Sequence, residues 1–116
     1  MVVARTITLL RSHSIVAELR ISKTLIEPDV EMIKANATLR DGSILYVSEA
    51  TGEGWREYSY HWQIKGKLVK RWDNAPHHKD LPNFPHHVHE GNQVMPSIDV
   101  NLTDILVHIE AEIKKH

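Results

Sequence analysis

The chain contains no cysteine, and this absence removes several kinds of chemistry at once. Without thiols there is no disulfide framework, no thiolate nucleophile and no cysteine-ligated zinc site. The sequence also lacks the run of about 18 apolar residues that a membrane-spanning helix needs, and nothing in it resembles a secretory signal. We therefore expect a cytoplasmic protein with no membrane partner.

Net charge is almost absent as well. The 14 basic and 15 acidic residues leave a formal charge of −1, which argues against general attraction to nucleic acid. The charge is uneven, however, because residues 61–80 are mainly basic and residues 27–57 mainly acidic. With 116 residues, 41% of them hydrophobic, the chain predicts one domain, residues 1–116, with its own core.

Alternating apolar and polar residues predict strands through the first two thirds of the chain. Residues 17–22 and 32–39 have a period of two, which is typical of strands with one face on a core. Asp41-Gly42 favours a tight hairpin turn. Further strands are expected in "SILYVSEA", "WREYSYHWQI" and "LVKRW". Short turns between them predict an antiparallel meander.

The two ends of the chain are predicted to be helical. Residues 4–12 form a short apolar segment, and residues 102–113 carry a stripe of leucine and isoleucine with Asn101 as a cap. The expected fold class is α+β: a curled antiparallel meander sheet of about five strands, with a short N-terminal helix and an amphipathic C-terminal helix packed on it.

The aromatic residues of the long central strand allow two interpretations. In "WREYSYHWQI" the strand pleat places Tyr58, Tyr60 and Trp62 on one face and His61 on the other. With Trp72 on the next strand, these aromatics either fill the core or form a stacking platform for single-stranded RNA bases. The pleat leaves His61 on the polar face, where it is the better functional candidate.

Histidines gather in the segment "RWDNAPHHKDLPNFPHHVHEG", residues 71–91, which holds five of the nine in the chain. It overlaps a connection of roughly 27 residues, 74–100, between the last expected strand and the last helix, and such long loops are usually functional or disordered. Its prolines and apolar residues predict an ordered cover over one sheet face. The imidazoles it presents are His77, His78, His86, His87 and His89.

Three uses of these histidines are compatible with the sequence. His87 and His89, or His86 and His89, could ligate Zn²⁺ or Ni²⁺, with His77, Asp73 or Glu90 completing the site. Alternatively, imidazoles could act as general base and acid in ribonuclease-type cleavage without a metal. In the third interpretation, the rings only hydrogen-bond the backbone of a proline-rich loop.

At these residues the chain resembles the TumE family, toxin components of bacterial and archaeal toxin–antitoxin modules. The resemblance rests on "YSYHWQ", "GKLVKRWDNAPHH" and "LPNFPHHVHEG", followed by a terminal amphipathic helix, and covers residues 43–113. It implies a cognate antitoxin as partner. It does not carry over an activity, and a ribonuclease role rests on analogy with other compact antiparallel toxins.

Our leading hypothesis is a toxin that cleaves RNA by histidine-based acid–base chemistry, with no metal and no cofactor. In it His61 or His86 is the base, His87 or His89 the acid, and Arg71 the phosphate clamp. The expected substrate-binding residues are Trp62, Lys70, Trp72, Asp73, Asn74, His77 and His78. The alternative is a non-catalytic metal-binding or protein-interaction module with a histidine-rich loop. A homodimer is compatible with either hypothesis.

Overall fold

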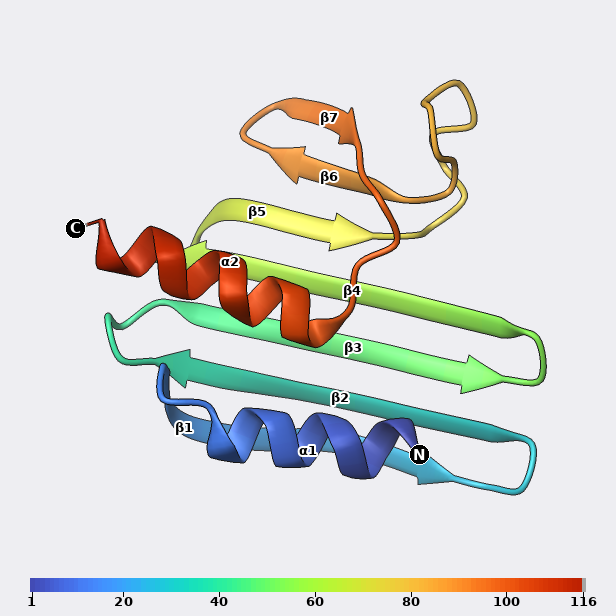
Figure 1. The fold of residues 1–116 in the computed structure, drawn as a ribbon, viewed down its shortest axis with the longest axis horizontal. Helices are drawn as coiled ribbons and strands as arrows, with labels where there is room; N and C mark the ends of the chain where they lie inside the picture. The colour runs from blue at the N-terminus through green and yellow to red at the C-terminus, as the bar shows by residue number, and fades with distance from the viewer. Residues whose placement is uncertain (116) are drawn as a thin grey trace.

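The computed structural model describes residues 1–115, and its centre is a seven-stranded antiparallel sheet in which every strand pairs with the next along the chain (Figure 1). The strands are β1 Val16–Ile26, β2 Val30–Leu39, β3 Ile44–Gly52, β4 Trp55–Ile64, β5 Lys67–Asp73, β6 His87–Glu90 and β7 Gln93–Pro96. Short turns join them, except that the loop of residues 74–86 connects β5 to β6. The α+β class and the meander are therefore confirmed.

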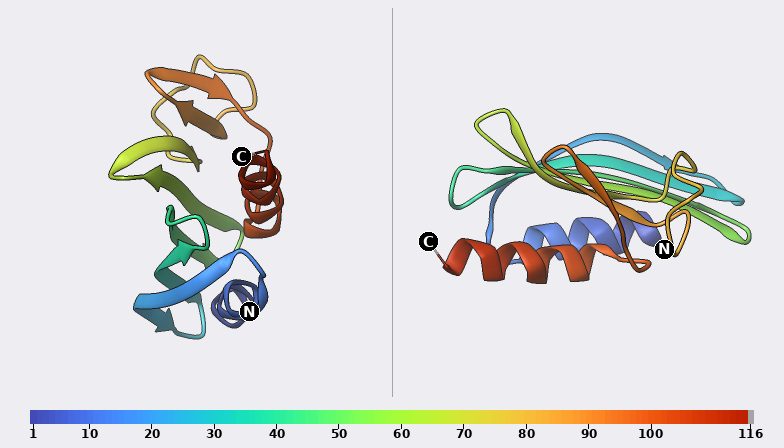
Figure 2. Two further views of the ribbon diagram at one scale, coloured as in Figure 1. Left: turned by 90° about the vertical axis from the view of Figure 1, so that its left-hand side faces the viewer. Right: turned by 90° about the horizontal axis from the view of Figure 1, so that it is seen from above.

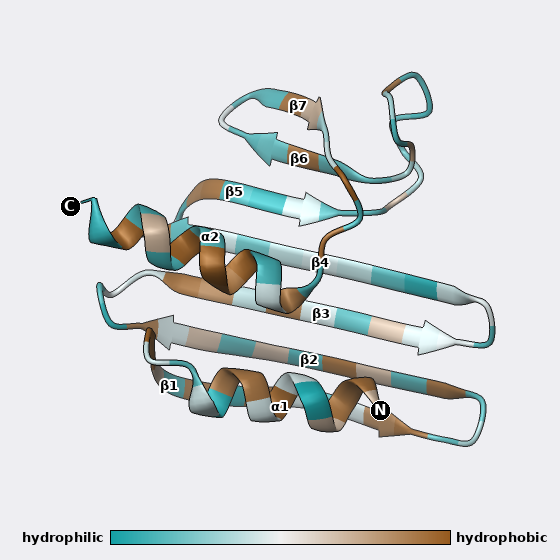
Figure 3. Cartoon of the chain, viewed as in Figure 1, coloured by the Kyte–Doolittle hydropathy of each residue, from teal (hydrophilic) through white to brown (hydrophobic). Residues whose placement is uncertain are grey.

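Two helices, α1 Val2–Ser12 and α2 Leu102–Lys114, lie on the same face of the curved sheet (Figure 2). Each buries one apolar stripe against the strands, seen as brown bands in Figure 3. Asn101 and Asp104 form a reciprocal capping box at the start of α2, which satisfies backbone N–H groups that the first turn leaves free. Within residues 1–115 no helix is long and apolar enough to cross a membrane.

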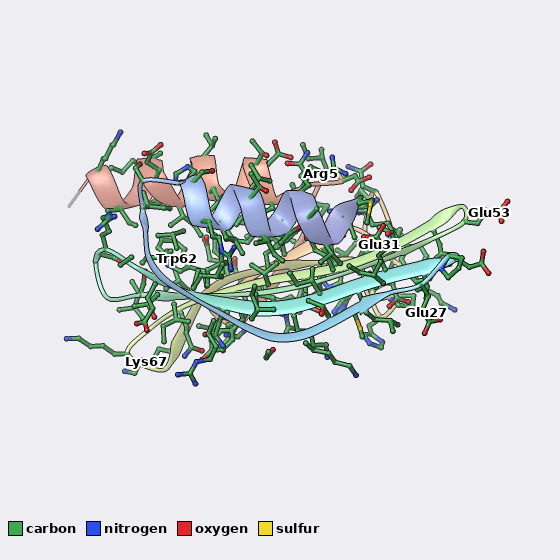
Figure 4. The ribbon with its side chains drawn as sticks, turned by 90° about the horizontal axis from the view of Figure 1, so that it is seen from below. Arg5, Glu27, Glu31, Glu53, Trp62 and Lys67 are labelled. Carbon is green, nitrogen blue, oxygen red and sulfur yellow. The ribbon has the colours of Figure 1, made fainter. Side chains whose placement is uncertain are left out.

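The central aromatics belong to the core between the sheet and the helices. Tyr60 is fully buried, Trp62 is 4% exposed and Trp72 is 7% exposed. Figure 4 places Trp62 between the two layers. The core interpretation is correct, because this burial leaves no ring face open for stacking bases.

The sheet has seven strands, not about five, because part of the expected loop is a hairpin. Residues 87–96 form β6 and β7, and β6 pairs with β5 through Trp72–Val88 and Asp73–His87. Gly91, with a φ of 60°, provides the turn between them. The irregular parts of the connection are residues 74–86 and the short link 97–101. His87 and His89 stand on a strand, where their directions are fixed by the pleat.

His108 of α2 packs against the last long strand. Its ring meets the Trp72 ring edge-on at 5.2 Å, and its Nε2 lies 3.2 Å from Lys70 Nζ. Burial, and next the charge of Lys70, lower the pKa of His108 below its usual value. The other charged groups that influence this ring are Glu90, Glu112 and Lys115.

This lowered pKa makes a prediction about stability. As pH falls through about 6.5, the unfolded chain binds a proton at His108 more readily than the folded chain, so the free energy of unfolding decreases. A His108→Asn variant should lose this part of the pH dependence. Urea unfolding near pH 8 and near pH 5.5 measures it; an unchanged difference between the two pH values in the variant would contradict the prediction.

Candidate functional site

The sheet face opposite the helices, here called the open face, carries two rows of polar side chains that run across the strands. Strand register defines them. The first row is Lys34, Ser48, Ser59, Asp73 and His87. The second row is Asn36, Tyr46, His61, Arg71 and His89. Because side chains directly opposite one another in an antiparallel pair have Cβ atoms about 5 Å apart, each row is a line of neighbours.

The Asp73 carboxylate is the centre of the site and is 5% exposed. Its Oδ2 accepts a hydrogen bond from Arg71 Nε at 3.0 Å, and its Oδ1 lies 2.8 Å from His87 Nε2. The backbone N–H of Ala75 also donates to Oδ1, at 3.0 Å. A buried carboxylate needs such partners, and here they come from β5, from β6 and from the loop.

His87 is held at both ring nitrogens. Its Nδ1 lies 2.9 Å from the Pro85 carbonyl oxygen, and its Nε2 faces Asp73. His87 is 2% exposed, so the contacts with Pro85 and Asp73 fix the buried ring in place.

His89 stands next to His87 on the same face but has a different partner. Arg71 Nη2 donates to His89 Nε2 at 3.1 Å, so this nitrogen carries a lone pair. Burial first, and then the Arg71 charge, lower the pKa of His89. They outweigh Asp73, which is 3.5 Å away and acts in the opposite direction. The neutral ring is therefore the favoured form.

His78 completes a group of three imidazoles from the loop side. Its ring centre is 4.8 Å from that of His87 and 5.7 Å from that of His89. The rings of His87 and His89 are themselves 4.8 Å apart. One nitrogen from each of the three residues lies within 4.8 Å of the others. We call His78, His87 and His89 the histidine trio.

A cavity of about 830 Å³ opens in front of the trio, between the loop and the open face. Arg71 and Lys34 also line it, together with two aromatic side chains, Trp55 and Phe84, that are 45% and 41% exposed. The Trp55 indole covers Gly52, where an added Cβ would lie 2.1 Å from its Nε1. One indole face is therefore packed and the ring is held in position.

The sequence interpretation missed Trp55 and Phe84. Trp55 follows the turn "TGEG" and falls on the polar side of its strand, and this combination was the available signal. Phe84 lies among prolines and is one of the apolar residues from which the sequence predicts an ordered cover. Its exposure shows that the ring is not buried by the rest of the loop.

The structure does not bring His61 and His86 into the trio. His61 is directly opposite Arg71 on the open face, but its ring contacts Tyr46 and hydrogen-bonds Gln63, outside the cavity lining. His86 lies beside a core aromatic: its Nδ1 is 2.8 Å from the hydroxyl of Tyr58. His86 and His87 are adjacent in the chain, but His86 contacts a core tyrosine and His87 belongs to the trio.

Of the other expected substrate-binding residues, three lie on the helix side of the sheet. Trp62 and Trp72 are buried there. Lys70 pairs with Glu90 at 3.0 Å and contacts His108 of α2. These side chains support the sheet from beneath and do not line the cavity in front of the trio.

Asn74 and His77 remain at the cavity. The Asn74 side chain accepts from the Tyr58 N–H at 2.9 Å and donates to the Arg56 carbonyl at 2.7 Å, so it fastens the start of the loop to β4. His77 is exposed and lines the cavity. Of the expected metal ligands, His87 and His89 belong to the trio, and His86 and His77 do not.

Comparison with known families fits this arrangement. Residues 6–114 match the family described as Toxin TumE. The chain belongs to the TumE toxin family. The matched range includes both polar rows, the loop and the trio, and it extends the resemblance seen in the sequence to nearly the whole chain. Membership of a toxin family makes this a toxin component and implies an antitoxin as its partner. Neither the curated proteins nor the solved structures contain a match.

The central position of Asp73 in this TumE protein predicts a large effect of its replacement. Asp73→Asn removes the charge that the buried His87 ring and Arg71 share, and breaking a buried pair costs about 3 kcal/mol or more in the free energy of unfolding. Urea unfolding measures it. The control is Glu90→Gln, whose carboxylate is 48% exposed in its pair with Lys70, and which should cost less than about 1 kcal/mol. Equal effects of the two substitutions would contradict the central role.

Proposed function

We propose that this TumE toxin cleaves RNA by imidazole acid–base chemistry in the cavity of the open face. The observation that carries the proposal is the group formed by Arg71, His89 and His78. A neutral imidazole, a guanidinium and a second imidazole border one cavity. These are the three groups that metal-independent phosphodiester cleavage needs: a base, a cation for the phosphate charge and an acid.

In the proposed reaction His89 Nε2 removes the proton of a ribose 2′-hydroxyl. The 2′-oxygen then forms a bond to phosphorus, and the bond from phosphorus to the 5′-oxygen breaks. His78 donates a proton to this leaving oxygen, which gives a 2′,3′-cyclic phosphate and a free 5′-hydroxyl. Arg71 turns its Nη2 from His89 to the phosphate and stabilises the charge of the transition state. The buried His87–Asp73 pair positions both Arg71 and His89.

The cavity lining supports a single-stranded substrate. Trp55 and Phe84 offer exposed ring faces on which unpaired bases can stack. Lys34 lies in the cavity lining, and within residues 1–115 no carboxylate is within ion-pair distance of it. Lys34 belongs to β2, and its partner on the neighbouring strand β1 is Lys23. Two like charges facing each other are unfavourable, and a phosphate between them would relieve the repulsion.

The cleavage proposal predicts a loss of activity in His89→Ala. The rate of cleavage of a single-stranded RNA oligonucleotide should fall by about 10²-fold or more, because the general base is removed. The measurement is a single-turnover assay in the presence of a chelator. An oligonucleotide with a 2′-deoxy sugar at the cleavage site should not be cut by the wild type.

The matched control is His86→Gln. It also removes an imidazole, but one that faces Tyr58 and not the trio, so its activity should stay near that of the wild type. Full activity of His89→Ala, or cleavage of the deoxy-substituted oligonucleotide, would refute the proposed chemistry.

The proposed substrate contacts predict separate effects on affinity. Lys34→Gln should weaken RNA binding and reduce the slope of log K against log salt by about 0.7, the value for one phosphate of a single strand. Trp55→Ala should weaken binding by about 1–3 kcal/mol through loss of stacking. Fluorescence anisotropy with labelled RNA over a salt series measures both.

The structure offers a matched control for each. Lys67 is an exposed lysine at the far end of β4 and β5 (Figure 4), and Tyr46 is an exposed aromatic on the open face that does not line the cavity. Lys67→Gln and Tyr46→Ala should leave the affinity near that of the wild type. Equal losses in a variant and its control would show that the RNA does not occupy the cavity.

A further inference from the structure

The histidine trio also has the composition and arrangement of a metal site. Three imidazole nitrogens, one each from His78, His87 and His89, lie within 4.8 Å of one another. Imidazole is a ligand of Zn²⁺, Ni²⁺ and Cu²⁺, whereas Mg²⁺ and Ca²⁺ prefer oxygen. The three rings are inclined to one another by 69° to 73°, so they meet edge-on and none is stacked flat on another.

The best oriented of the three ligands is His87. Its Nδ1 faces the Pro85 carbonyl, which fixes the hydrogen on that nitrogen and leaves Nε2 beside Asp73. Metal-binding histidines are commonly held in this way, with the second ring nitrogen bonded to a backbone carbonyl or carboxylate. The metal would bind Nε2, the ring nitrogen that lies 2.8 Å from Asp73 Oδ1.

Asp73 can supply a fourth ligand. Its two oxygens lie 2.8 Å from His87 Nε2 and 3.5 Å from His89 Nε2. A carboxylate also offsets the charge of the ion beside Arg71, which already donates to the same carboxylate. Three imidazoles and one carboxylate make the four-coordinate set that Zn²⁺ accepts in proteins.

The remaining step is a small contraction of the trio. Nitrogens bound to one tetrahedral Zn²⁺ at about 2.0 Å are roughly 3.3 Å apart, so nitrogens up to 4.8 Å apart must approach by a further 1.5 Å or so. His87 and His89 are fixed on β6. His78 stands on the loop, and movement of this residue closes the site.

We propose that His78, His87 and His89, with Asp73, bind one Zn²⁺ ion that ties the loop of residues 74–86 to the sheet. The ion occupies the nitrogen lone pairs of the trio. It therefore excludes the acid–base cleavage described above, so zinc is an inhibitor of the toxin. The binding site stands on its own geometry, whereas the inhibition rests on the proposed function.

The test uses the full chain, purified without an affinity tag and freed of metal with a chelator. Titration calorimetry with ZnSO₄ should give one equivalent of bound ion, and zinc should raise the melting temperature, because a ligand that binds only the folded state stabilises it. MgCl₂ at the same concentration should do neither. His78→Gln and His89→Gln should each weaken zinc binding by about tenfold or more.

The matched control is His77→Gln, which removes the neighbouring imidazole of the same loop and should bind zinc as the wild type does. Circular dichroism establishes that each variant is folded. A wild type that binds no zinc, or a His78→Gln variant that binds it unchanged, would overturn the site. So would an equal loss of binding in His77→Gln.

The cleavage assay separates the two proposals. Cleavage in chelator that stops on addition of one equivalent of zinc supports both. Zinc binding without any RNA cleavage refutes the proposed function and leaves the site in place, and cleavage without zinc binding does the reverse. Cleavage that increases with zinc would overturn the inhibition.

Discussion

The Asp73 carboxylate is the interaction on which the functional face depends. It is buried, and it is reached by Arg71 from its own strand, by His87 from β6 and by the backbone of Ala75 in the loop. A charge in such a place is stable only if all its partners are present. The last long strand, the terminal hairpin and the start of the loop are therefore fastened together at one carboxylate, and the same contacts fix the directions of the rings beside it.

The position of the helices explains why chemistry collects on the other side of the sheet. Both ends of the chain return to one face and cover its aromatic core, with Leu10 and Ile109 among the fully buried side chains. The pleat then places the polar side chains of the two rows on the open face. The side chains that form the core therefore lie on one face of the sheet, and the candidate functional side chains lie on the other. Tyr60 and His61, next to each other in the chain, belong to different halves of this division.

Much of the fold could be predicted, because apolar and polar residues alternate regularly in β2 to β5 and because Asn101 is a typical cap at the start of α2. The terminal hairpin could not. "HVHE" has one aliphatic residue in four, and it is a strand because β5 offers it a complete set of pairing partners. The site was predicted only in part for the same reason: without β6, nothing distinguishes His87 and His89 from His86. The pleat of β6 places His87 and His89 on the same face of the sheet. A segment that is expected to be a loop gives no such prediction about side-chain directions.

The pleat also sets what the trio can do. Arg71 and Asp73 are two residues apart on β5, and His87 and His89 are two apart on β6, so register alone makes them a square of neighbours. Within this square, the Asp73 carboxylate and the lone pair of His89 can each bind only some of their possible partners at one time. A proton, the Arg71 guanidinium and a metal ion compete for them. His78 is the only member of the trio that the sheet does not hold. The loop therefore decides which use is available, because the third imidazole is present only where residues 74–86 lie against the open face.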